Sequence, residues 1–172
     1  MRQVVLSILV DNTSGVLSRV SGLFSRRGYN ITSLTVGETQ DSSISRITVV
    51  IKGDNHIIDQ IKKQLAKLED VREIFELISG ESVVRELILV KVVSNNETRQ
   101  NIIGIADIFR AKIVDVSADS MVIELTGDEA KINAFLKLLE DFTVTELVRT
   151  GITGLARGTE DGIPSASEES HE

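Results

Sequence analysis

The stretch VVLSILVDNTSGVLSRVSGLFSRRG (residues 4–28) decides the organisation of the first half of the chain. Its first seven residues are mostly β-branched or aliphatic, which is typical of a strand. Short polar residues and Gly15 then interrupt the apolar run. Apolar residues resume at the spacing of one helix face, at Val16, Val20, Leu23 and Phe24, and Gly28 follows as a helix stop. The sequence therefore predicts a strand that passes through a short turn into a helix.

Three further strands and one helix are predicted before residue 80. The segments ITSLTVG (residues 31–37), SRITVVIK (residues 45–52) and VREIFELI (residues 71–78) have the composition of strands, and apolar residues recur at helical spacing within residues 57–68. The resulting order is βαββαβ, which is the ferredoxin-like arrangement. A sheet of this kind has two edges that are open to pairing with another chain.

The same order returns after SGES (residues 79–82). Strand patterns occupy residues 86–93, 112–116, 121–127 and 142–148, and helical spacing occupies residues 102–109 and 132–139. We therefore predict an α+β fold with two tandem ferredoxin-like βαββαβ units, in residues 1–79 and 80–158. From Gly151 onward the pattern fails, and residues 154–172 are rich in Gly, Ser and acidic residues, so we predict that residues 159–172 form a disordered acidic tail.

Charge and composition disfavour several classes of function. The net charge is −7, and residues 81–172 carry seventeen Asp/Glu against nine Lys/Arg. A general nucleic-acid binder is therefore not expected, since neutralisation of phosphates supplies most of its affinity. No Cys and only two His are present, so we expect no metal site. The apolar runs are far shorter than the roughly 20 residues that span a bilayer, and no signal peptide is recognisable. We expect a cytoplasmic protein with no membrane association.

No set of residues indicates catalysis. His56 is the only histidine before residue 159, and it is expected on the surface beside a helix start. Most carboxylates are expected to cap helices or to face solvent, and no pair has the spacing of a general acid and base. Gly15, Gly22 and Gly28 lack the spacing of a phosphate-binding loop. We therefore expect no catalytic residue on this chain.

The turn at residues 11–15 allows two interpretations. It can be an ordinary helix cap, or it can be the seat of a bound carboxylate. The other three helices are expected to begin near acidic residues, at Asp54, Glu97 and Asp128, whereas the first helix has no acidic residue in its first turn. Its free amides and positive dipole end would then be available to an anion. Val16 and Leu17 would supply an apolar wall, and Asn12 offers both a donor and an acceptor.

Several motifs in order resemble the regulatory (small) subunit family of acetolactate synthase, also called acetohydroxyacid synthase. These are DNTSGVLSRVSGLFSRRGYNITSLTV (residues 11–36), SRITVVIKGD (residues 45–54), VRELILVKV (residues 84–92), IFRAKIVDVS (residues 108–117) and RTGITGLARG (residues 149–158). The first unit resembles an ACT domain, a βαββαβ module that binds amino acids in many regulated biosynthetic proteins. The resemblance covers nearly all of the chain up to Gly158.

The resemblance implies a non-catalytic subunit in branched-chain amino acid biosynthesis. Such a subunit activates a thiamine-diphosphate-dependent catalytic subunit, which is a transferase, and confers feedback inhibition, usually by valine. Thiamine diphosphate, magnesium and FAD would bind to the catalytic subunit, and this chain would need no cofactor. The second unit lacks a matching DNxSG turn, so we expect it to serve dimerisation and partner contact rather than to bind valine.

The resemblance also implies where the effector binds. In this family the ACT domains pair side by side into a homodimer with a continuous sheet, and the effector lies at their interface. The residues of this chain that match the family's effector site are Asn12, Gly15, Val16 and Leu17 from one copy and Asn30 and Ile31 from the other.

Two alternatives from other classes remain open at the level of sequence. A stand-alone enzyme would need a catalytic constellation, which the residues do not offer. An amino-acid-responsive nucleic-acid regulator would need a helix-turn-helix or a basic arm, and neither is visible.

Overall fold

The computed structural model describes residues 1–158, and the contacts divide the chain into two compact units. The first unit holds residues 1–83 together with the segment that begins at Ile152, and the second unit holds residues 84–151. The sequence places the boundary after residue 79, whereas the contacts place it after Val83. The predicted acidic tail, residues 159–172, lies outside the described residues.

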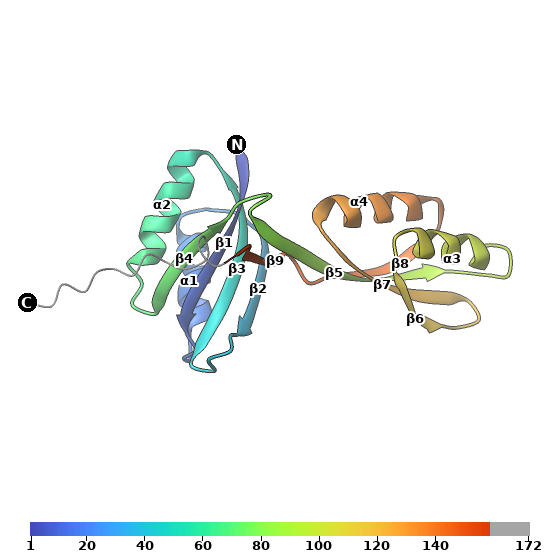
Figure 1. Cartoon of the computed structure of the whole chain (residues 1–172), viewed down its shortest axis with the longest axis horizontal. Helices are drawn as coiled ribbons and strands as arrows, with labels where there is room; N and C mark the ends of the chain where they lie inside the picture. Colours follow the sequence, from blue (N-terminus) through green and yellow to red (C-terminus); the bar gives the residue numbers. More distant parts are fainter. Residues whose placement is uncertain (159–172) are drawn as a thin grey trace, which may run out of the picture. The chain divides into compact units, whose positions relative to one another are not determined.

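The first unit has the predicted βαββαβ order (Figure 1). Its elements are β1 (Arg2–Asp11), α1 (Val16–Arg26), β2 (Ile31–Glu38), β3 (Ile44–Gly53), α2 (Asn55–Ala66) and β4 (Val71–Leu77). The strands form one antiparallel sheet in the order β2-β3-β1-β4. Both helices pack on the same face of this sheet, so the opposite face carries no helix.

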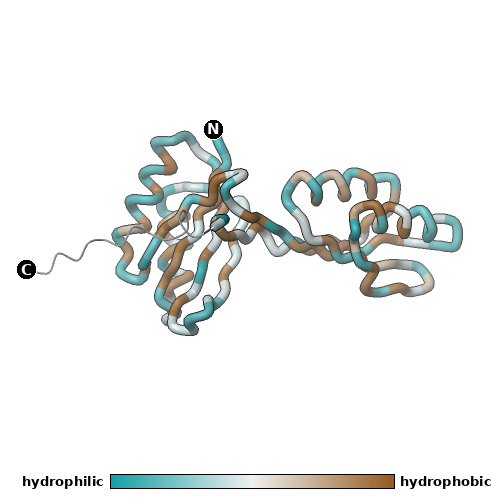
Figure 2. Tube along the Cα trace, in the orientation of Figure 1, coloured by the Kyte–Doolittle hydropathy of each residue, from teal (hydrophilic) through white to brown (hydrophobic). Residues whose placement is uncertain are grey.

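The core of the first unit lies between the sheet and the two helices. Alternate residues of β1 point into it, as expected for a strand with one face covered. The buried apolar side chains are Val4, Leu6, Ile8, Val10, Val16, Val20, Leu23, Phe24, Ile47, Val49, Ile51, Ile58, Ile61 and Leu65. The α1 members of this set are the four that the sequence predicts. Figure 2 shows apolar residues along the strands and hydrophilic residues gathered in the loops.

The second unit repeats the arrangement. Its elements are β5 (Ser82–Val93, whose first two residues belong to the first unit), α3 (Arg99–Ile108), β6 (Lys112–Val116), β7 (Ser120–Gly127), α4 (Glu129–Leu138), the short 3-10 helix Leu139–Asp141 and β8 (Val144–Arg149). The strand order is β6-β7-β5-β8. Ile102, Ile132 and Phe135 from the helices pack on Val90 and Ile123 from the strands. The prediction of two ferredoxin-like units is confirmed.

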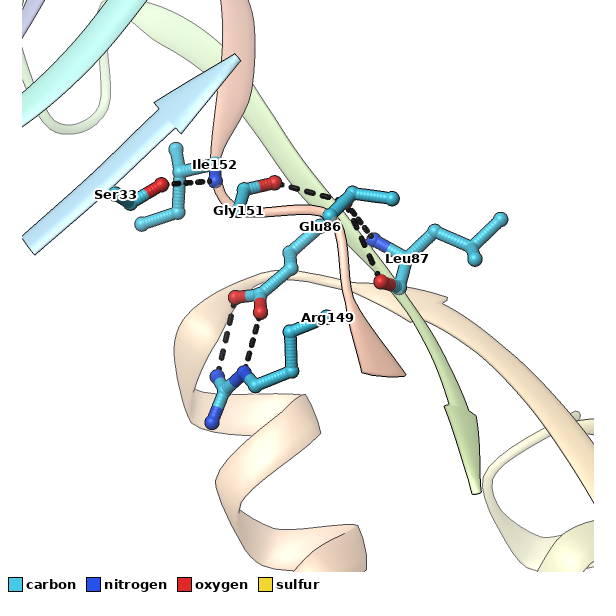
Figure 3. Close-up of polar contacts among 7 residues, drawn as sticks. Ser33, Glu86, Leu87, Arg149, Gly151 and Ile152 are labelled. Atoms are coloured by element: carbon cyan, nitrogen blue, oxygen red, sulfur yellow. Dashed lines mark hydrogen bonds and ion pairs between the residues drawn. The ribbon is translucent and has the colours of Figure 1, made fainter. Parts of the chain in front are cut away.

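The end of the described chain differs from the sequence-based domain limits. The sequence pattern places residues 152–158 in the second domain, whereas the contacts place them in the first unit. The Ile152 amide donates to the Ser33 hydroxyl at 2.9 Å (Figure 3), and β9 (Thr153–Ala156) pairs with β5. The Arg157 amide donates to the Glu81 carbonyl at 2.8 Å. A strand of four residues is too short to show a period, so its partner could not be read from the pattern.

An ion pair between the buried Glu86 and the more exposed Arg149 holds the chain just before residues 152–158. Glu86 is only 5% exposed, and both of its carboxylate oxygens accept from the Arg149 guanidinium, one of them at 3.1 Å (Figure 3). The bonds to Glu86 raise the pKa of Arg149. The Thr150 amide donates to the Leu87 carbonyl at 3.0 Å, and the Leu87 amide donates to the Thr150 hydroxyl at 3.1 Å. The end of β8 is therefore held firmly to β5.

Replacing Phe24 by Ala removes a ring that is 1% exposed in the core of the first unit. We expect the free energy of unfolding to fall by about 3–5 kcal/mol, because the lost transfer energy and a residual cavity both contribute. Replacing Ile78, which is 51% exposed, by Ala should cost less than about 1 kcal/mol. Urea denaturation followed by circular dichroism measures both values. Equal losses for the two variants would contradict this assignment of the core.

Candidate functional site

The start of α1 has an unusual cap. Gly15 is the N-cap residue and has φ +84° and ψ −1°, a left-handed conformation that favours glycine. No side chain caps this helix, and its first turn contains no acidic residue. The first intrahelical bond runs from the Arg19 amide to the Gly15 carbonyl at 3.0 Å. The amides of Val16, Leu17 and Ser18 therefore lie at the positive end of the helix without a side-chain acceptor.

Two of the other helices are capped by carboxylates, as predicted. The Asp54 carboxylate accepts from the Ile57 amide at 2.8 Å at the start of α2. The Asp128 carboxylate accepts from the Lys131 amide at 2.9 Å at the start of α4, and Glu129 follows in the first turn. The sequence thus correctly distinguished α1 from α2 and α4.

Helix α3 begins near Glu97 as predicted, but this acidic residue does not cap it. Thr98, not an acidic residue, is its N-cap, and Glu97 lies one residue before that cap. The first turn of α3 contains no acidic residue, and no side chain caps it. Instead, the Asn95 side-chain oxygen accepts from the amides of Glu97 and Thr98, both at 2.9 Å. An acidic residue is therefore missing from the first turn of α1, α2 and α3 alike, and the left-handed Gly15 at the N-cap is what distinguishes α1.

Hydrogen bonds of Asn12 connect the turn to the β2–β3 hairpin. Its backbone amide donates to the Ser43 carbonyl at 2.8 Å. Its side-chain amide donates to the Glu38 carboxylate at 3.1 Å and to the Ser42 carbonyl at 2.9 Å. The hairpin tip is itself ordered by bonds from the Ser43 hydroxyl and amide to Asp41, which lower the pKa of that carboxyl. Both donors of the Asn12 side chain are thus used, and its Oδ1 has no partner among the described residues.

The other side of the turn is braced by the segment before β4. The Asp11 amide donates to the Asp70 carbonyl at 2.9 Å, and the Asp11 carboxylate forms an ion pair with Arg72. Arg19 donates to the Asp70 carboxylate at 2.6 Å, and this bond raises the pKa of Arg19. A Cβ atom on Gly15 would lie 3.0 Å from the Arg19 guanidinium. The turn is therefore held from two sides, and residue 15 has little room for a side chain.

The sequence does not predict these hydrogen bonds and ion pairs around the turn. Glu38, Ser42, Asp70 and Arg72 lie between 26 and 61 residues away from their partners in the turn. No local pattern carries that information, because the pairing depends on strand register.

Asn30 and Ile31 lie far from the turn within one chain. Asn30 is exposed just before β2, and Ile31 is the first residue of that strand. Asn12 contacts Glu38, which is the last residue of β2. Seven residues of strand span about 23 Å, so the two predicted parts of the site lie at opposite ends of the sheet. One chain alone does not bring them together.

An open hollow runs along the solvent side of α1 from Gly15. It has a volume of about 450 Å³ and is lined by Gly15, Ser18, Arg19, Gly22, Ser25 and Arg26. A Cβ atom on Gly22 would meet nothing within 4 Å, so this side of the helix is free of packed neighbours. The helix start thus opens onto accessible space rather than onto the core.

Residues 1–158 contain no group of three or more His, Asp or Glu side chains that could hold a metal ion. Over the same residues, no helix is both long and apolar enough to cross a membrane.

Comparisons with known proteins cover both units. A model described as the acetohydroxyacid synthase small subunit-like ACT domain matches residues 6–73, and one described as the small subunit of acetolactate synthase matches residues 85–158. A probable acetolactate synthase small subunit from Methanothermobacter thermautotrophicus is 48% identical over 156 residues, which cover 90% of this chain and 93% of that protein. The acetolactate synthase small subunit of Bacillus subtilis is 46% identical over 163 residues, which cover 94% of each chain.

One solved structure is similar to this chain both in fold and in sequence. The crystal structure of the acetolactate synthase small subunit from Thermotoga maritima superposes with a TM-score of 0.86 at 41% sequence identity, and the match covers 92% of this chain and 99% of that one. With both units matched by the family's models and close relatives aligned over nearly their whole length, the chain belongs to the family of acetolactate synthase small subunits.

Proposed function

We propose that this chain is the non-catalytic regulatory subunit of an acetolactate synthase and carries valine feedback inhibition. It acts in the cytoplasm, in branched-chain amino acid biosynthesis, by binding to and activating a catalytic subunit. Thiamine diphosphate, magnesium and FAD belong to that catalytic subunit. Two copies of this chain form a homodimer, and valine binds where the start of α1 of one copy meets the start of β2 of the other.

The separation of the two predicted half-sites is the observation that carries this proposal. β2 is an edge strand, and its outer edge has no partner strand among residues 1–158. Antiparallel pairing of two β2 strands would place the beginning of one beside the end of the other. Asn30 and Ile31 of the second copy would then approach Glu38, which is the position where Asn12 and the start of α1 lie.

Each part of the combined site has a distinct role toward an α-amino acid. The carboxylate binds the amides of Val16, Leu17 and Ser18, which have no side-chain cap. The ammonium group donates to the free Oδ1 of Asn12 and to Asn30 of the second copy. The isopropyl group packs against Leu17, which is 44% exposed in the single chain, and against Ile31 of the second copy.

This arrangement couples effector binding to the pairing of the two copies. Because neither copy holds a complete site, valine binds only the paired state and stabilises it by mass action. Feedback inhibition further requires that valine bind one state of the complex with the catalytic subunit more tightly than another.

Titration calorimetry tests the effector. We expect valine to bind saturably with one molecule per chain, and sedimentation equilibrium should show that valine strengthens the homodimer. Leucine and isoleucine, tested in parallel, measure the size limit of the pocket. If none of the three binds, even with the catalytic subunit present, the effector site is wrong.

Replacing Gly15 by Asp should abolish valine inhibition and leave activation of the catalytic subunit largely intact. The new carboxylate would occupy the position of the ligand's carboxylate, and a φ of +84° disfavours any side chain. Gly80→Asp is a matched control, because Gly80 has φ +85° and a Cβ atom there meets nothing within 4 Å. Acetolactate formation with and without valine measures both effects. Inhibition that survives in the Gly15→Asp variant would place the site elsewhere.

A further inference from the structure

The face of the first sheet opposite α1 and α2 is here called the open face. Strand register places Gly37, Arg46, Leu9 and Glu73 in one row across it, from β2 to β4. Thr48 and Ser7 lie in the next row, and both are almost completely buried. The segment of residues 152–158 contacts the far end of this face, where the Ile152 amide donates to the Ser33 hydroxyl. Within residues 1–158, no helix covers the end of this face around Arg46.

Arg46 is a partly buried cation with few hydrogen-bond partners among residues 1–158. Among the described residues its guanidinium donates to one neutral acceptor, the Ser7 hydroxyl. Glu73 lies on the other side of Leu9, and its charge favours the cation without forming an ion pair. Burial lowers the pKa of Arg46, because the guanidinium has lost part of its hydration. A guanidinium has five N–H donors, so most of its hydrogen-bonding capacity is unused here.

Other cations of the first unit contrast with it. Arg2 and Lys62 both bind the Glu76 carboxylate, and Arg19 binds Asp70, with nitrogen to oxygen distances of 2.6–2.7 Å. These three side chains satisfy their charge within the chain. Arg46 is partly desolvated yet forms no ion pair with a carboxylate of residues 1–158, which is a costly arrangement unless a partner supplies one.

The surroundings keep the guanidinium approachable. Gly37 is the direct neighbour of Arg46 on β2, and a Cβ atom there would meet nothing within 4 Å. The four strands present a surface roughly 14 Å across, which suits a protein better than a small anion. Antiparallel pairing through β2 would use the edge of the sheet and leave both open faces on the same side of the joined sheet.

We propose that the open face around Arg46 is the surface by which the first unit docks on the catalytic subunit, with a carboxylate of that subunit bound to the Arg46 guanidinium. A carboxylate matches the planar fork of a guanidinium through two parallel hydrogen bonds. Leu9, which is partly exposed beside Arg46, adds an apolar surface to the contact. The proposal rests on the partnership with a catalytic subunit and is independent of the valine site.

The first experiment removes the charge. Arg46→Met keeps a long side chain and should weaken binding to the purified catalytic subunit by about tenfold or more, because the partner's carboxylate would be left unpaired. Lys63→Met, on the exposed side of α2, is the matched control and should bind like the unaltered chain. Valine binding by the Arg46→Met homodimer should be unchanged. Affinity of Arg46→Met within twofold of the control would overturn the proposal.

The second experiment does not depend on the fold of the Arg46→Met variant. The chain contains no Cys, so Gly37→Cys and Lys63→Cys each introduce a single thiol. Maleimide labelling of this chain, followed by mass spectrometry, should slow markedly for Gly37→Cys when the catalytic subunit is added, and should not slow for Lys63→Cys. If the Gly37→Cys chain binds the catalytic subunit normally but its thiol is labelled as fast as in the free chain, the proposed docking surface is wrong, and the partnership with the catalytic subunit stands. Failure of the unaltered chain to bind the catalytic subunit overturns the partnership and the docking surface together.

Discussion

The first unit depends on the double pairing of β1. This strand is hydrogen-bonded to β3 from Arg2 to Asp11 and to β4 from Val5 to Val10, so its end cannot shift without breaking two ladders. The turn at residues 11–15, which follows β1, therefore has a fixed position. Bonds from Asn12 to the β2–β3 hairpin and from Asp11 to the segment before β4 extend that rigidity to the start of α1. Preorganisation of this kind lowers the entropic cost of ligand binding.

The same topology separates the two predicted parts of the effector site, the turn before α1 and the beginning of β2. β2 runs parallel to β1, because both are antiparallel to β3, so its beginning lies at the end of the sheet opposite the turn. In the proposed homodimer, a second copy paired through β2 would remove this separation. Regulation would then be a property of the homodimer, and the edge strand, which is otherwise a liability for aggregation, would gain a defined partner.

The sequence predicts the repeated units and their core well, because each long element has a clear period. The α1 residues Val20 and Phe24, for example, are buried as their spacing indicates. It does not predict the return of Ile152 to the first unit, because β9 has too few residues to show a period. Glu97 lies beside the start of α3 as predicted, but the sequence does not show that Thr98, rather than an acidic residue, is the N-cap. The constraint on the Asn12 amide and the isolation of Arg46 depend on strand register across more than 25 residues, which no local pattern encodes.

The central claim is that each effector site is shared between two copies, and subunit complementation measures this directly. A chain with Gly15→Asp lacks a functional turn, and a chain with Asn30→Ala lacks the contribution from β2. Neither homodimer should bind valine tightly. After the two variants are mixed and allowed to exchange subunits, each mixed dimer should regain one intact site, and calorimetry should detect valine binding at the affinity of the unaltered chain. Absence of any recovered binding in verified mixed dimers would contradict a shared site and would place both halves within one chain.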